Sequence, residues 1–111
     1  MQQLLRRLVT GDDAAITAIV DASHTSDDPL ILVAAALFAP HGDRLLLRAE
    51  RLASTTRDRQ LVAIAVAHHH GDRELVDALA RDHLVDHPDN VLVAWIANAS
   101  HHQSPSKEEK R

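Results

Sequence analysis

The feature that most constrains this chain is a repeated pair of residues, because each of its three glycines is followed directly by aspartate. The pairs Gly11-Asp12, Gly42-Asp43 and Gly71-Asp72 stand 31 and 29 residues apart. The second and third share a longer string, His-Gly-Asp-Arg, over 41–44 and 70–73. Glycine ends a helix at low cost because it accepts the left-handed conformation, and aspartate caps the next helix. The sequence therefore predicts an internal repeat of two helices joined by a tight turn.

Further start signals divide the chain into seven predicted helices. Asp28-Pro29 and His87-Pro88 each precede an apolar run, and proline suits the first helical position. The hydroxyl groups of Ser54, Thr55 and Thr56 are candidate caps for the helix that follows them, predicted over 57–69. The second helix of each unit is amphipathic, whereas the first is apolar almost all round and is expected to be buried on several sides. The predicted helices are 2–10, 13–23, 29–39, 44–54, 57–69, 73–86 and 89–101.

These helices predict an all-α fold of stacked helix-turn-helix repeats, with one domain over 1–102 and a disordered polar tail over 103–111. A small parallel sheet is the alternative, because Val62, Ile64 and Val66 alternate with alanine and fit one strand of a βαβ unit. His41 and His68–His70 would then lie at strand carboxyl ends, forming a small-molecule or metal site of clustered histidines. Alanine is poor in strands, so helices are favoured.

With the helix pairs in place, the third unit resembles a tetratricopeptide repeat. Gly71-Asp72 lies 17 residues before Pro88, within the closing segment 86–90, and the family's turn glycine and closing proline have that separation. Gly11 and Pro29, 18 residues apart, repeat the pattern loosely. The resemblance covers about 90 residues and is specific over 60–95.

The chain departs from the family pattern at several positions. The middle unit has Arg57-Asp58 where a proline is expected, Val76 and His83 replace small packing residues, and the aromatic positions are aliphatic. The resemblance implies a right-handed stack whose first helices line a concave groove that holds a peptide or another protein, without chemistry. The groove positions that it implies are Leu32, Val33, Ala36, Asp58, Val62, Ala65, His68, His69, Leu92, Trp95, Ile96, Ala99 and His102.

Nine histidines are the one compositional oddity with chemical content. His83 and His87 stand at i, i+4, the spacing at which two imidazoles share a metal ion, but zinc needs three or four ligands. Histidine near a helix C-terminus also satisfies free carbonyls, and His41, His70 and His87 fit that role. We expect no metal site and no cofactor. No serine or threonine has a spacing-defined catalytic partner, so a non-enzymatic binding module is favoured over an enzyme.

Charge and hydropathy narrow the classes of partner. The formal net charge is −4, without the basic stripe that nucleic-acid binding requires. The longest apolar run, Leu30–Pro40, is 11 residues, whereas a membrane span needs about 20. The N-terminal apolar run is interrupted by Arg6 and Arg7, which argues against a signal peptide. We therefore expect a cytoplasmic protein with a protein or peptide partner, and neither nucleic acid nor membrane.

The last predicted helix is apolar on nearly every side, through Val91, Leu92, Val93, Trp95 and Ile96. A terminal repeat helix normally presents a polar outer face. We expect its apolar face to be covered by a second copy in a homodimer or by another partner, with Trp95 and Ile96 at or beside the interface. The alternative is that the helix folds back and is buried in its own monomer.

Overall fold

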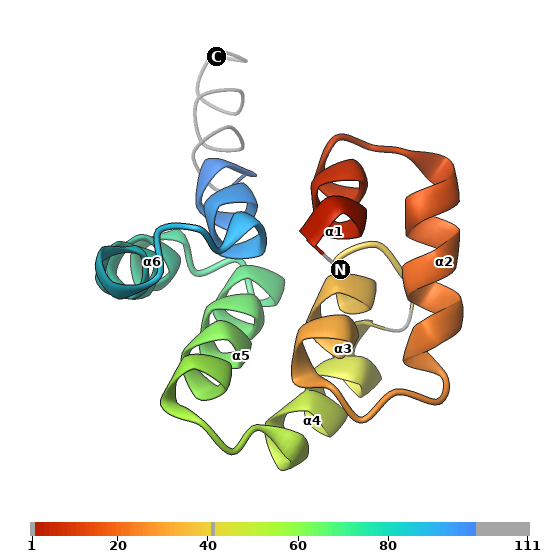
Figure 1. The fold of residues 1–111 in the computed structure, drawn as a ribbon. Helices are drawn as coiled ribbons and strands as arrows, with labels where there is room; N and C mark the ends of the chain where they lie inside the picture. Colours follow the sequence, from red (N-terminus) through yellow and green to blue (C-terminus); the bar gives the residue numbers. More distant parts are fainter. Residues whose placement is uncertain (1, 41, 100–111) are drawn as a thin grey trace, which may run out of the picture.

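The structure, a computed structural model, describes residues 2–40 and 42–99. Within these ranges the chain is all helical and has no strand, so the parallel-sheet alternative is wrong (Figure 1). Six helices are followed by a seventh helical segment over 91–99. The six helices are α1 (Gln2–Val9), α2 (Asp13–Ser23), α3 (Pro29–Ala36), α4 (Gly42–Leu52), α5 (Thr56–His69) and α6 (Arg73–Asp86). The predicted tail, 103–111, lies outside the described residues.

Two of the three predicted Gly-Asp turns are confirmed. Gly11 and Gly71 have φ angles of 87° and 76°, in the left-handed region that glycine tolerates best. The following aspartates cap α2 and α6, because the Asp12 carboxylate accepts bonds from two backbone N–H groups and that of Asp72 accepts one from Leu75. These turns therefore join helices through local chemistry that is readable from the sequence.

Gly42 is different, although its neighbours in the sequence match those of Gly71. It is buried, lies outside the left-handed region and is itself the first residue of α4. A Cβ atom at Gly42 would lie 2.6 Å from the carbonyl oxygen of Ala36, so glycine is needed here for close approach of two backbones. Helix α3 ends at Ala36 rather than at 39. Pro40, four residues after Ala36, has no N–H to donate to the Ala36 carbonyl, so the helical hydrogen-bond pattern cannot continue there.

The remaining helix starts follow the predicted capping chemistry, with one shift. Asp28 caps α3 with Pro29 at the first position, and the Thr55 hydroxyl accepts a bond from the N–H of Asp58. Pro88 instead lies in a turn, and Asn90 caps the last helical segment by accepting from Val93. That segment therefore begins at 91 rather than 89.

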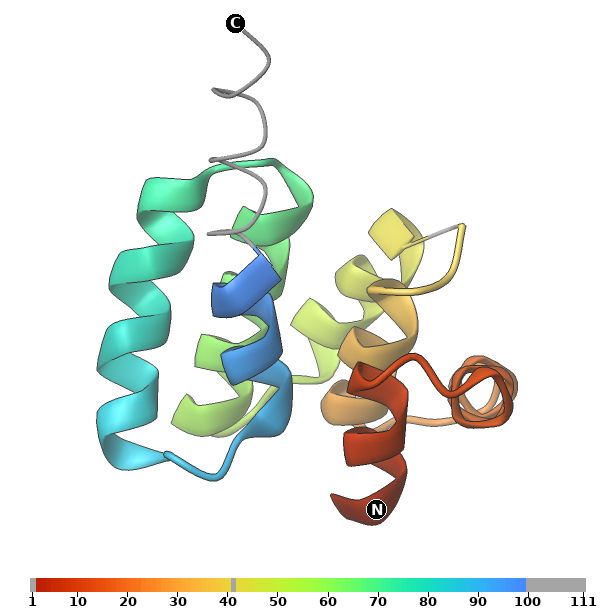
Figure 2. The same cartoon turned by 90° about the horizontal axis from the view of Figure 1, so that it is seen from above.

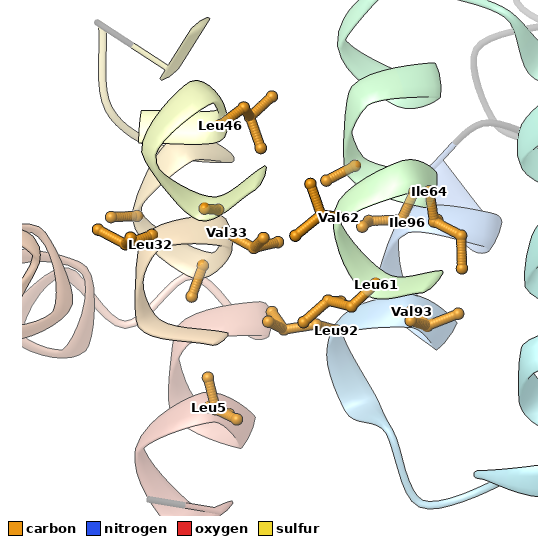
Figure 3. Packing of buried hydrophobic residues seen from close by; sticks show 14 of the residues in the cluster. Leu5, Leu32, Val33, Leu46, Leu61, Val62, Ile64, Leu92, Val93 and Ile96 are labelled. Carbon is orange, nitrogen blue, oxygen red and sulfur yellow. The ribbon is translucent and has the colours of Figure 1, made fainter. Parts of the chain in front are cut away.

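The hydrophobic core lies where the first helices of the units converge. Helices α1, α3 and α5 and the segment 91–99 surround it, with α2 on one side of the molecule and α6 on the other (Figures 1 and 2). Figure 3 shows side chains from all four of these elements in one region, among them Leu5, Val33, Val62 and Leu92. The helices thus close around a common interior. No helix in the described part is long and apolar enough to cross a membrane.

One long side chain ties the first and second units together. The Arg48 guanidinium of α4 donates to the carbonyl oxygens of Ser23 (3.0 Å) and Ser26 (2.9 Å), at the end of α2 and just beyond it. Carbonyl groups at a helix C-terminus lack intrahelical partners, so a cation that donates to them is favourable. The arginine side of α4 is therefore fixed toward α2.

Candidate functional site

Five of the predicted groove residues lie in the interior, where no peptide can reach them. Leu32, Val33, Val62, Leu92 and Ile96 are each at most 3% exposed. Ala65 is also buried, at 1% exposed, but it lines a pocket near the C-terminal end of α5. The open concave surface implied by the repeat family is closed here because α1 and the segment 91–99 pack with α3 and α5 around the same core (Figure 3). These positions therefore serve packing in this structure.

Several of the other predicted positions gather near the C-terminal ends of α3 and α5. Ala36, His68 and His69 line a pocket of about 220 Å³ together with Leu46. Half-buried Trp95 borders His68, with ring centroids 6.1 Å apart. Asp58 lies in the first turn of α5, at the other end of that helix, and half-buried Ala99 is in the last helical segment. His102 lies outside the described residues.

A second pocket, of about 270 Å³, adjoins the first because both are lined by Leu46 and His69. We call the two together the α4–α5 groove, since α4 and α5 form its walls and contact each other. The second pocket is lined by Asp43, Leu46, Leu47 and Glu50 of α4 and by Val66, His69 and His70 of α5 and its C-cap.

The groove combines an apolar floor with polar walls of two kinds. Leu47 is 55% exposed, and it is one of three exposed large apolar side chains among the described residues. Asp43 and Glu50 lie on the same side of α4 and are exposed. On the α5 side, the rings of His69 and His70 are exposed, with centroids 6.0 Å apart. Such a surface offers apolar contact flanked by hydrogen-bonding and charged groups.

Two aromatic rings, Phe38 and Trp95, pack beside His68, which lines the groove. Phe38, just after α3, lies 5.3 Å from Trp95 between ring centroids, and His68 meets the edge of the same indole. Burial lowers the pKa of His68, and the nearby His69 lowers it further. His68 therefore presents a neutral ring to Trp95 at neutral pH, and the three rings form a firm border rather than a charged one.

The histidine pair on α6 is not a free chelating pair. His83 is fully buried, and its two ring nitrogens contact Gln60 Oε1 (2.8 Å) and Asn90 Nδ2 (3.0 Å). The ring of His87 stacks near it at 4.7 Å. Among the residues that the structure describes, no group of three or more His, Asp or Glu side chains is arranged to hold a metal ion. His83 therefore has a structural role.

A third cleft, of about 310 Å³, lies between α5 and α6. Arg59, Ala63, Leu79 and Asp82 are among its lining residues, and none of the strongly exposed large apolar side chains borders it. The α4–α5 groove is therefore the better candidate for recognition, because it alone of these clefts contains such a side chain, Leu47.

Sequence reasoning missed the α4 wall of the groove. The signal for it is the spacing of Asp43, Leu47 and Glu50 at i, i+4 and i+7, which places them on one side of a helix. A second ridge on α4 consists of Arg44, Arg48 and Arg51, and Arg48 binds the end of α2. The two ridges are about 100° apart around α4, so they face different neighbours.

The last helical segment differs from its sequence-based expectation. Leu92, Val93 and Ile96 are fully buried within their own chain, so their apolar character needs no cover from a partner. These three residues follow the alternative, in which the helix folds back onto its own chain, and Ile96 has no exposed surface of its own. A homodimer or partner interface at or beside Trp95 and Ile96 stays a prediction. Trp95 is half-buried and borders the groove through His68.

No family model, curated protein or solved structure matches this chain.

Proposed function

We propose that this protein is a non-enzymatic helical-repeat module that binds a segment of another protein in the α4–α5 groove. The observation that carries the proposal is the position of Leu47, a leucine 55% exposed inside a groove with polar walls. An apolar patch rimmed by polar groups is typical of protein interaction sites. Burying a leucine against a partner is worth about 1.5–3 kcal/mol, which suits a recognition anchor.

The groove supports binding better than catalysis. General acid–base catalysis needs side chains held within hydrogen-bonding reach of a reacting group, usually by other side chains. Within the described part of the chain, neither His69 nor His70 forms a hydrogen bond to a hydroxyl or carboxylate. Both imidazoles are exposed surface groups, which fits hydrogen bonding to a partner.

The α4–α5 groove lies at a different place from the binding surface that the tetratricopeptide resemblance implies. In the tetratricopeptide resemblance the binding surface belongs to the first helices of the units. Here those helices are closed around the core, and the accessible groove lies between the second helix of one unit, α4, and the first helix of the next, α5. Grooves between successive units are a natural consequence of stacking helix pairs.

The proposal is tested by selecting a random peptide library on the protein and measuring the enriched peptides by isothermal titration calorimetry. Leu47→Gln is expected to weaken binding by about tenfold or more, because the buried leucine contact is lost. Val85→Gln is the matched control, since Val85 is 77% exposed on α6, away from the groove. The proposal would be contradicted if both variants kept native circular dichroism spectra but lost the same amount of peptide affinity. It would also be contradicted if the library yielded no enriched peptide.

A further inference from the structure

The carboxylates of the groove suggest what kind of segment it takes. Asp43 and Glu50 are seven residues apart on α4, about 10 Å along the helix axis. Leu47 lies between them along the same side, and Leu46 and Val66 lie deeper in the groove. The α4 side of the groove therefore presents apolar side chains between two carboxylates, Asp43 at one end and Glu50 at the other.

Neither carboxylate is neutralised by the part of the chain that the structure describes. Neither Asp43 nor Glu50 takes part in an ion pair or a hydrogen bond with these residues. The Arg48 guanidinium of α4 is held by the carbonyl groups at the end of α2. Two negative charges thus remain available on the groove wall.

We propose that the partner segment is an amphipathic helix or strand with apolar side chains for Leu46, Leu47 and Val66, and with lysine or arginine for Asp43 and Glu50. This inference rests on the proposed function and adds the charge of the partner. Complementary charge at a rim chiefly sets specificity and association rate, while the apolar contact provides most of the affinity. The cationic residues therefore select among peptides that already fit the floor.

The opposite wall offers hydrogen-bonding groups to a basic partner. His69 and His70 line the groove from the α5 side, and Asp43 and Glu50 line it from the α4 side. The nitrogen of a neutral imidazole that carries no hydrogen accepts a hydrogen bond from an ammonium or guanidinium group. Both walls are therefore compatible with a basic segment.

The test uses three peptide libraries with the same randomised apolar positions and only lysine, only glutamine or only glutamate at the polar positions. We expect the lysine library to be enriched on the wild-type protein. Combining Asp43→Asn with Glu50→Gln is expected to remove that preference and to weaken lysine peptides by about two- to fivefold for each lost pair. High salt is expected to act in the same direction on wild type and to have little effect on the neutralised variant.

The matched control combines Asp21→Asn with Glu74→Gln, which removes the same charge from exposed positions on α2 and α6. It is expected to retain the lysine preference. Peptides that depend on Leu47 but bind equally well after neutralisation of the groove would overturn the basic-partner inference and leave the proposed function standing. Enrichment of the glutamate library would overturn it too. Absence of any Leu47-dependent peptide would remove both proposals.

Discussion

Lowering the pH from about 7.5 to about 5.5 is expected to destabilise the fold through one buried side chain, His83. The amide of Asn90 is oriented by its capping role, because its Oδ1 accepts from the backbone N–H of Val93. Its Nδ2 group must then donate to His83 Nε2, which leaves Nδ1–H to donate to Gln60 Oε1. The three side chains are fully satisfied only when the imidazole is neutral, and protonation at Nε2 would set two donors against each other.

The charges around His83 favour the same neutral state. Burial is the main cause that lowers its pKa, and His87 and Arg57 lower it further, whereas Asp86 acts in the opposite direction. The unfolded chain takes up a proton near pH 6.5, while the folded chain resists it. The contribution of His83 to stability is therefore complete above pH 6.5 and declines as the pH falls below it. If the native ring stays neutral, the loss at pH 5.5 is about 1.4 kcal/mol.

The assay is urea denaturation, followed by circular dichroism, of the wild type and His83→Gln at both pH values. Glutamine is polar and does not titrate, so the variant is expected to be less stable overall but to lose less stability on acidification, by up to about 1.4 kcal/mol. The control His70→Gln, at an exposed position, is expected to keep the wild-type pH dependence. Identical pH dependence in wild type and His83→Gln would refute the reasoning, because other groups would then carry the effect.

Three further substitutions probe the turns and the contact between units, each measured by thermal and urea denaturation. Gly71→Val is expected to cost more than about 1 kcal/mol, because a β-branched residue resists a φ of 76°, and an unchanged melting temperature would contradict this. Gly42→Ala is expected to cost more than Gly71→Ala, since its Cβ would meet the Ala36 carbonyl at 2.6 Å, and the reverse order would show that α4 shifts freely. Arg48→Met removes both bonds to the end of α2 and is expected to cost about 1–3 kcal/mol, whereas a change within error would mean that water replaces them.

Local chemistry explains why most helix boundaries could be predicted. Asp12, Thr55 and Asp72 cap helices with side chains that act within three residues, so short sequence patterns contain the needed information. Gly42 shows what such patterns cannot predict. The residues around it match those around Gly71, but glycine is needed at Gly42 because the backbone lies close to the carbonyl of Ala36. That contact follows from how α4 crosses the end of α3, which no local signal describes.

The candidate site was harder to predict because it depends on long-range packing. The tetratricopeptide resemblance implies that Val62 and Leu92 line an open groove. In the structure the first helices of the units pack around a common core, and this packing buries both side chains. His83 looked like half of a surface pair, yet it meets Gln60 and Asn90, which lie 23 and 7 residues away in the chain. Sequence periodicity identifies apolar faces but does not say which of them remain accessible after the units pack.

The measurement that tests the proposed binding site most directly is chemical shift mapping, by NMR, of an enriched lysine-containing peptide on the isotopically labelled protein. We expect the largest amide shift changes at Leu47, Val66 and His69, which line the α4–α5 groove, and little change around Val85 on α6. The changes are expected to disappear in Leu47→Gln. Largest changes on α6 or in the segment 91–99, with the groove unaffected, would contradict the assignment of the groove as the binding site.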